Sequence, residues 1–416
     1  MSVVDTGGSG VPPNELGRRL REIRAWRGQS LEVTAGLAGI SFGYLGKLER
    51  GEKTLDNRRT VEALANALRV APSEFNGQPW ENSGAAPESY AGLVAIESAL
   101  EICELGEDPG GNLREWPEIA ADLAAVELLR EATDYPAVCA LAPQLFHELH
   151  AAYVRRPAWR TDVLIGLIRC YYVLAETAKR LAVRGLPIMM VKAAQACAEE
   201  LEDPAWLGFA VWLRGSISGS VSRPQQYQRA VATADRIAPS LNNHDVIQAY
   251  GMLNLSAALA AAVQGDRSTA DTHLTEAADV ARRMDTDTGQ FARLWFGRTN
   301  VDIWRSSIGM ELGDGVAAVE LVADVPVESI PSASRRANFW SEAGRTLLAE
   351  PSRRAQGTEL LVRAEATAPQ QTRSDLFVRE AVANQLRTAS RGVGGRELRG
   401  LAYRLGIAPE HGSRSY

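Results

Sequence analysis

Cysteine is scarce in this 416-residue sequence, which contains only Cys103, Cys139, Cys170 and Cys197. Successive cysteines are 27 to 36 residues apart within apolar stretches, and no C-x-x-C pair occurs. This spacing argues against a structural zinc site and against a disulfide framework. We expect four buried free thiols that pack as small apolar side chains.

Long hydrophobic runs and strand patterns are also missing. No run of about 18 uncharged apolar residues occurs, as a membrane-spanning helix would require. Residues 1–13 are rich in Gly, Pro and Ser and lack the basic and apolar regions of a signal peptide. We therefore expect a cytoplasmic protein with no membrane contact. Period-2 alternation between hairpin turns is absent, whereas Ala-rich stretches alternate with short Gly/Pro breaks, which predicts an all-α chain.

Basic residues are few overall but concentrated near the N-terminus. The chain has a net charge of −6, yet residues 14–76 contain 11 Arg or Lys against eight Asp or Glu, a net charge of +3. Residues 77–416 carry −8. A basic N-terminal segment on an acidic body favours a nucleic-acid-binding module attached to a domain with another role. Only four of the 45 basic residues are Lys, which with abundant Ala is typical of a GC-rich genome.

The stretch from Ser30 to Gly51 has the pattern of two short helices joined by a tight turn. Ser30 is a plausible N-cap, and Gly39 suits the left-handed conformation that ends a helix. Ser41 then caps a second helix that Gly51 closes, with Leu45 and Leu48 on one face. Two helices so joined form a helix-turn-helix, whose second helix enters the major groove of DNA.

Residues 14–76 resemble the XRE-type, or phage-repressor-like, helix-turn-helix family. The matching residues lie in one order along the segment: Leu16 to Arg24, Ala35, Ala38 to Ser41, Tyr44-Leu45, Leu48 to Gly51 and Val61 to Val70. The family often has Gln where Leu31 stands, Leu where Thr34 stands and a polar residue where Phe42 stands. The resemblance implies a five-helix DNA-binding domain in which a short fifth helix begins near Pro72 and Phe75 folds back onto the core.

Candidate DNA-binding residues follow from the expected orientation of the second helix. Its outer face would present Ser41, Phe42, Gly43, Gly46, Lys47 and Arg50. Lys47 has the chemistry to donate to guanine, and Phe42 to contact a thymine methyl group. Three basic residues are predicted to contact phosphates, namely Arg18, Lys53 and Arg58.

Glu49 lies on the same helix, but its carboxylate would repel phosphates. In the family, this position pairs with an arginine of the first helix, which corresponds to Arg24 here. We therefore predict that Arg24 and Glu49 form a structural pair that joins the first and third helices and makes no DNA contact.

The rest of the chain is divided into a linker, a helical repeat domain and a tail. Residues 77–89 are predicted to be a linker, residues 90–409 a repeat domain and residues 410–416 a tail, with residues 1–13 disordered. Residues 253–284 resemble a tetratricopeptide repeat, with paired helices turning at Gly265-Asp266 and small residues at the helix contact. Similar breaks recur at Gly185, at Gly313-Asp314 and at Glu350-Pro351. An α-solenoid of such pairs is expected, and an irregular Ala-rich helical bundle is the alternative.

No catalytic or metal-binding pattern stands out. His147 and His150 lack the i, i+4 spacing of a zinc protease motif, and we interpret them as solvated or capping residues. No Gly-rich phosphate loop follows a strand, and no Ser/His/Asp or Cys/His constellation is found. We predict that the protein is not an enzyme and holds neither a metal nor another cofactor.

A ligand groove is one interpretation of the aromatic cluster Phe291, Trp295, Phe296 and Trp304; simple repeat packing is the other. For the groove, we predict four effector-binding residues, namely Asn254, Arg298, Asn300 and Asn338.

The combination of domains resembles one-component transcriptional regulators of an actinobacterial type. The resemblance implies a homodimer that binds a two-fold symmetric double-stranded DNA operator and responds to a peptide or small-molecule effector. Two alternatives remain open: a protein-interaction adaptor tethered to DNA, and an antitoxin-like partner of a neighbouring toxin.

Overall fold

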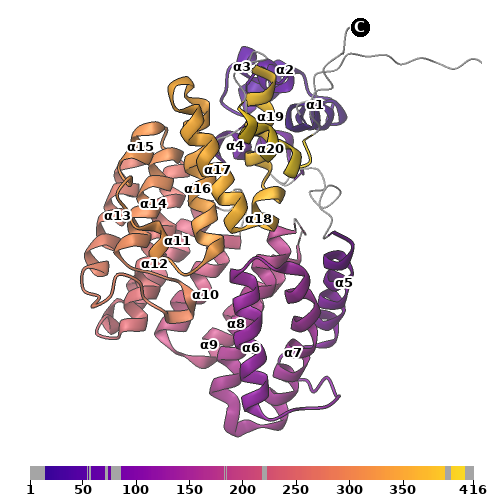
Figure 1. Ribbon diagram of the computed structural model, residues 1–416. Coiled ribbons are helices and arrows are strands. Elements are labelled where there is room, and N and C mark those ends of the chain that lie inside the picture. Colours follow the sequence, from indigo (N-terminus) through magenta and orange to yellow (C-terminus); the bar gives the residue numbers. More distant parts are fainter. Residues whose placement is uncertain are drawn as a thin grey trace, which may run out of the picture.

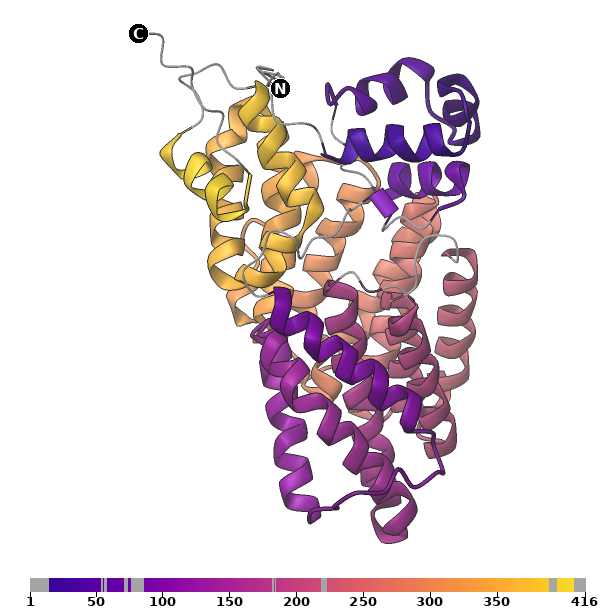
Figure 2. The same ribbon diagram turned by 90° about the vertical axis from the view of Figure 1, so that its right-hand side faces the viewer.

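The computed structural model describes residues 15–53, 55, 58–70, 74–75, 86–181, 183, 185–217, 223–388 and 395–407. Throughout these ranges the regular structure is helical, without a strand, which confirms the all-α prediction (Figure 1). A small N-terminal head lies at one end of a much larger helical body, beside the C-terminal helices (Figure 2). The predicted disordered segment 1–13, the tail 410–416 and most of the linker lie outside the described residues.

The described residues of the head form four α-helices: α1 (Glu15–Trp26), α2 (Leu31–Leu37), α3 (Phe42–Glu49) and α4 (Arg58–Leu68). Ser30 and Ser41 are the N-caps of α2 and α3, the two helices of the helix-turn-helix, as predicted. Ser30 Oγ accepts the N–H of Val33, and Ser41 Oγ accepts the N–H of Tyr44, each at 3.2 Å. Each bond satisfies one of the amide groups that the first turn of a helix leaves free. Gly39 ends α2 with a φ of +64°, which a side chain would disfavour.

The apolar faces of these helices converge on one small core. Leu20, Leu45, Leu64 and Leu68 are fully buried there, and Phe75 folds back onto them as expected. The fifth helix is described only at residues 74–75, which form a 3-10 turn.

The body begins at Ala86, inside the range predicted to be linker, and contains helices α5 to α20. Their bounds are α5 (Ala86–Ile102), α6 (Trp116–Glu131), α7 (Tyr135–Arg155), α8 (Arg160–Arg180), α9 (Leu186–Leu201), α10 (Pro204–Ile217), α11 (Arg223–Ile237), α12 (His244–Val263), α13 (Arg267–Ala281), α14 (Arg298–Glu311), α15 (Val316–Glu320), α16 (Ala333–Ala349), α17 (Arg354–Thr367), α18 (Pro369–Ser374), α19 (Leu376–Thr388) and α20 (Arg396–Arg404).

The even-numbered helices from α6 to α16 form a continuous row, in which each packs against the next. Intervening helices pack beside this row, so that α8 pairs with α9, α12 with α13 and α16 with α17. The turn at Gly265-Asp266 joins α12 to α13, and Ala258, Ala270 and Ala277 are fully buried where these helices meet. Close approach of paired helices is therefore the reason for small residues at these positions.

Helix α12 is long and apolar enough to cross a membrane, judged by length and composition alone. However, 83% of its apolar window is buried inside the body, where it packs against α10, α11 and α13. Its apolar character thus matches its position in the core. The four cysteines are also buried and unbridged, as predicted.

The body also contacts the head directly, through several separate elements. Leu376 of α19 belongs to the same apolar cluster as the head core. The carboxylate of Glu380, also in α19, accepts the backbone N–H of Leu16 at the start of α1 (3.4 Å). In addition, Arg223 of α11 pairs with Glu62 of α4 at 3.3 Å. The head is therefore held by side chains from two body helices, α11 and α19, that are far apart in the sequence.

Candidate nucleic-acid interface

Helix α3 presents an exposed outer face. Leu45 and Leu48 point into the head core, so Phe42, Gly43 and Lys47 are left in contact with solvent. Phe42 is 60% exposed, which is unusual for an aromatic side chain and suits contact with a base. The exposure of Phe42, Gly43 and Lys47 agrees with the outer face predicted from the sequence.

Two residues of the predicted outer face have a different role. Gly46 is buried, because the guanidinium of Arg50 lies over it. The Ser41 hydroxyl caps α3, so its first role is structural even though the residue is exposed.

The basic side chains around α3 differ in how they are held. Arg50 donates from Nε to Glu52 at 2.6 Å, and this hydrogen bond raises the Arg50 pKa. Arg18 pairs with Glu22 on the surface of α1. Lys47 and Lys53 are exposed. Arg58 belongs to α4, but its side chain lies outside the described part of the chain.

Arg24 and Glu49 form a two-pronged ion pair between α1 and α3. Arg24 Nε donates to Glu49 Oε1 at 2.6 Å, and Nη2 donates to Oε2 at 2.8 Å. The third donor group, Nη1, reaches the carbonyl of Gln29 at 2.9 Å. The Glu49 side chain is only 5% exposed, and its hydrogen bond with Arg24 raises the Arg24 pKa. This carboxylate is therefore buried and paired with a cation within the head, which reduces its repulsion of phosphates.

A second polar contact in the head was not anticipated. Thr34 is fully buried where the family often has Leu, and its hydroxyl donates to the Gln29 side chain at 2.9 Å. Gln29 in turn donates to the Ala67 carbonyl on α4 at 3.2 Å. The sequence did contain a signal for this contact: Thr34 is polar at a position where the family is usually apolar, and a buried hydroxyl needs a hydrogen-bond partner.

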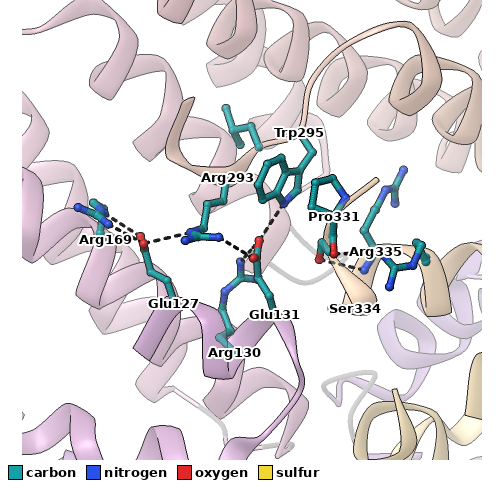
Figure 3. A network of polar contacts seen from close by, with 12 residues as sticks. Glu127, Arg130, Glu131, Arg169, Arg293, Trp295, Pro331, Ser334 and Arg335 are labelled. Atoms are coloured by element: carbon teal, nitrogen blue, oxygen red, sulfur yellow. Dashed lines mark hydrogen bonds and ion pairs between the residues drawn. The ribbon is translucent and has the colours of Figure 1, made fainter. Parts of the chain in front are cut away.

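The loop between α13 and α14, which contains Trp295 of the aromatic cluster, is bound to the chain's own helix α6. Arg293 of this loop lies between two glutamates of α6, donating to Glu127 at 3.1 Å and to Glu131 at 2.7 Å (Figure 3). The Trp295 indole donates to Glu131 at 2.8 Å, and Arg169 of α8 reaches Glu127. The loop is therefore bound to α6, a helix more than 160 residues earlier in the sequence.

Unusual backbone geometry accompanies these contacts. Ala292, Arg293 and Trp295 have φ values of +45°, +54° and +52°, in the left-handed region that residues with side chains seldom adopt. Surrounding contacts must hold such residues in place. Within this loop, Phe291 and Phe296 are buried, which agrees with the packing interpretation of the aromatic cluster.

The four candidate effector residues differ in burial and in the residues that they contact. Asn254 is buried and contacts Tyr250 and His273, whereas Arg298 pairs with Asp287 on the surface. Asn300 is buried and accepts a hydrogen bond from Arg335 at 3.1 Å. Asn338 on α16 is half-buried. A ligand at Asn300 would have to displace a contact that the chain makes with itself.

His150 differs from its prediction. It is buried, with Nδ1 2.9 Å from the Phe146 carbonyl, and burial lowers its pKa. Within the described ranges, no group of three or more His, Cys, Asp or Glu side chains is arranged to hold a metal ion.

Comparison with known proteins places this head among DNA-binding domains. The helix-turn-helix domain family matches residues 15–76. The HTH-type transcriptional regulator DdrOP3 of Deinococcus deserti is 33% identical over 120 residues, a match that covers 27% of this chain and 81% of that protein. No solved structure matches the chain significantly. Through its N-terminal domain, the chain belongs to the helix-turn-helix transcriptional regulators, and it is a DNA-binding regulator.

Proposed function

We propose that the protein is a homodimeric, sequence-specific regulator that binds a two-fold symmetric operator. The observation that carries this proposal is the outer face of α3, where Phe42 and Lys47 are exposed while Glu49 is neutralised by Arg24. An apolar contact and a hydrogen-bond donor on one helical face suit the edges of bases in the major groove.

Dimerisation follows from the geometry of operators. Each head covers one half-site, and two heads must lie about 34 Å apart, or a multiple of this distance, to bind together. Glu380 and Arg223 attach the head to the body, so an interface between two bodies would set the separation of the heads. We propose that the row of paired helices is a tetratricopeptide-like solenoid that supplies this interface.

An effector is the third part of the proposal. A peptide or small molecule bound to the body would alter the separation or the attachment of the heads, and so change operator affinity. Coupling between two such sites is typically worth about 1–3 kcal/mol.

The test begins with the DNA sites that the full-length protein selects from fragmented genomic DNA. Lys47→Ala should lose about 1–3 kcal/mol of binding free energy on a selected site and relax specificity at one base pair. Lys53→Ala should instead weaken binding to all sequences and reduce the salt dependence, because a phosphate contact reads no bases.

Sedimentation of the full-length protein measures dimerisation in the same samples. Equal affinity for selected and random DNA at every salt concentration would refute specific recognition. A monomer that binds the complete operator as one copy would refute the dimer.

A further inference from the structure

Helix α20 buries one side and exposes a basic and aromatic side. Its buried residues pack against α17 and α19: Leu398, Leu401 and Ala402. On the other side Arg396, Arg399 and Tyr403 are exposed, and Tyr403 keeps 76% of its surface in contact with solvent. At about 100° per residue, these three positions fall within about 60° of one another around the helix axis. They therefore form one continuous face, the α20 outer face.

The two arginines of the α20 outer face carry charges that no neighbouring carboxylate balances. Several exposed arginines elsewhere on the body are held in ion pairs: Arg155 with Asp108, Arg267 with Asp314 and Arg363 with Glu328. By contrast, Arg396 and Arg399 form no ion pair within the part of the chain that the structure describes. Glu397, the acidic residue of this helix, lies about 100° around the axis from Arg396, at the edge of the face. The face is therefore locally positive, although residues 77–416 carry a net charge of −8.

The α20 outer face belongs to the same end of the molecule as the DNA-binding head. Both views show α19, α20 and the head at this end, and Figure 1 shows α3 on the side of the head away from the body (Figures 1 and 2). Helix α20 packs against α19, which contacts the head through Leu376 and Glu380. A duplex bound to α3 would therefore lie across the end of the molecule that also carries α20.

The chemistry of this face suits the phosphate backbone of DNA. Guanidinium groups and tyrosine hydroxyls both donate hydrogen bonds to phosphate oxygens. A full turn of the duplex extends for about 34 Å, so DNA beyond one half-site continues past the head and over the surfaces beside it. An acidic protein segment would match the same charge, but the head brings DNA to this end of the molecule. The flanking duplex is therefore the ligand that position and charge favour together.

We propose that the α20 outer face binds the phosphate backbone of DNA that flanks the half-site read by α3. The body thus binds DNA itself, in addition to setting the separation of the heads. This inference rests on the proposed function, because it requires α3 to face the operator. It assigns no base contact to α20, so the sequence of the flanking DNA should have no effect.

The test uses full-length protein and two duplexes: the selected site alone, and the same site extended by about one helical turn (~10 bp) of arbitrary sequence on each side. Wild-type protein should bind the extended duplex about tenfold more tightly. Arg396→Gln combined with Arg399→Gln should remove this advantage and leave binding to the short duplex unchanged. On the extended duplex, the slope of log affinity against log salt should fall by about 2, because each lost phosphate contact removes about 0.9.

The matched control is Arg236→Gln combined with Arg283→Gln, which removes the same two charges from exposed positions. These residues lie at the ends of α11 and α13 that are farther from the head, since Arg223 at the other end of α11 pairs with α4. At the other end of α13, Gly265 lies against the guanidinium of Arg59 in the head. The control should bind both duplexes like the wild type. Equal losses in the two double variants would show that net charge alone is responsible and would overturn the proposal.

The remaining outcomes separate this inference from the proposed function. Unchanged affinity of the α20 variant for the extended duplex, or an equal loss on both duplexes, would overturn the inference. A change in the sedimentation of this variant without DNA would assign the face to a contact between copies of the chain and would also overturn it. Wild-type protein that binds selected and random sites equally, but gains from flanking DNA only when Arg396 and Arg399 are present, would refute the proposed function and support the inference.

Discussion

The head and the body reach their structures in different ways. In the head, contacts such as Ser30 with Val33 and Ser41 with Tyr44 join residues three apart, and each determines where a helix begins. In the body, Arg293 meets Glu127 across 166 residues, and the contact determines how distant helices are arranged. Local signals thus shape the helix-turn-helix, whereas long-range ion pairs arrange the helices of the body.

The largest expected effect comes from breaking the long-range network. Glu131→Ala removes the acceptor of the Trp295 indole and one partner of Arg293, leaving polar groups buried without their partners. We expect a loss of about 3 kcal/mol in the free energy of unfolding, measured by urea denaturation. Glu97→Ala, an exposed glutamate of α5, is the control and should have little effect. Equal losses in the two variants would mean that the network adds no stability.

Removing the body's contribution to the head core should have the next largest effect. Leu376→Ala deletes a side chain that packs with the head cluster, and because Leu376 keeps 8% of its surface exposed, we expect a loss of about 2 kcal/mol, the lower end for such deletions. We expect hydrogen exchange in α1 and α4 to increase, while α6 to α8 remain protected. Unchanged exchange in the head would show that its core is complete without α19.

The Arg24–Glu49 pair provides a test within the head alone. A double-mutant cycle with Ala at both positions should give a coupling of about 0.5–3 kcal/mol in stability. The salt dependence of DNA binding should not change, since both side chains are largely buried in their contact with each other. Additive effects would indicate that the two-pronged contact contributes no interaction energy.

The smallest expected effect comes from removing a helix-capping hydrogen bond in the head. Ser41→Ala should cost about 1 kcal/mol, because it removes the hydroxyl that caps α3. Ser98→Ala, an exposed serine within α5, is the control and should have little effect. A loss well above that of Leu376→Ala would reverse the order proposed for the two regions.

These contrasts explain what could be predicted from the sequence. Ser30, Gly39 and Ser41 act on their own neighbours, so their patterns were sufficient to place α2 and α3. The Arg24–Glu49 pair was predicted through family resemblance, which carries information about contacts that local spacing lacks. Paired helices around Gly265 were predicted because small residues and a Gly-containing turn leave a repeated pattern.

The remaining features depend on residues that only the folded chain brings together. Nothing in the vicinity of Leu16 indicates that Glu380 will accept its N–H, 364 residues away. Likewise, the left-handed residues of the α13–α14 loop are not suited to that conformation by type, and contacts with α6 hold Arg293 and Trp295 in place. The hydrogen bond from Asn300 to the Leu294 carbonyl of this loop could therefore not be predicted from the sequence.

The contribution of Leu376 to the head core has a consequence for synthesis on the ribosome. The head is translated first, but the residue that completes its core is translated about 300 residues later, near the end of the chain. A nascent chain therefore carries a head that has yet to meet Leu376 and Glu380. Fragments released before α19 is translated would lack both contacts, so full attachment of the head requires synthesis through this helix.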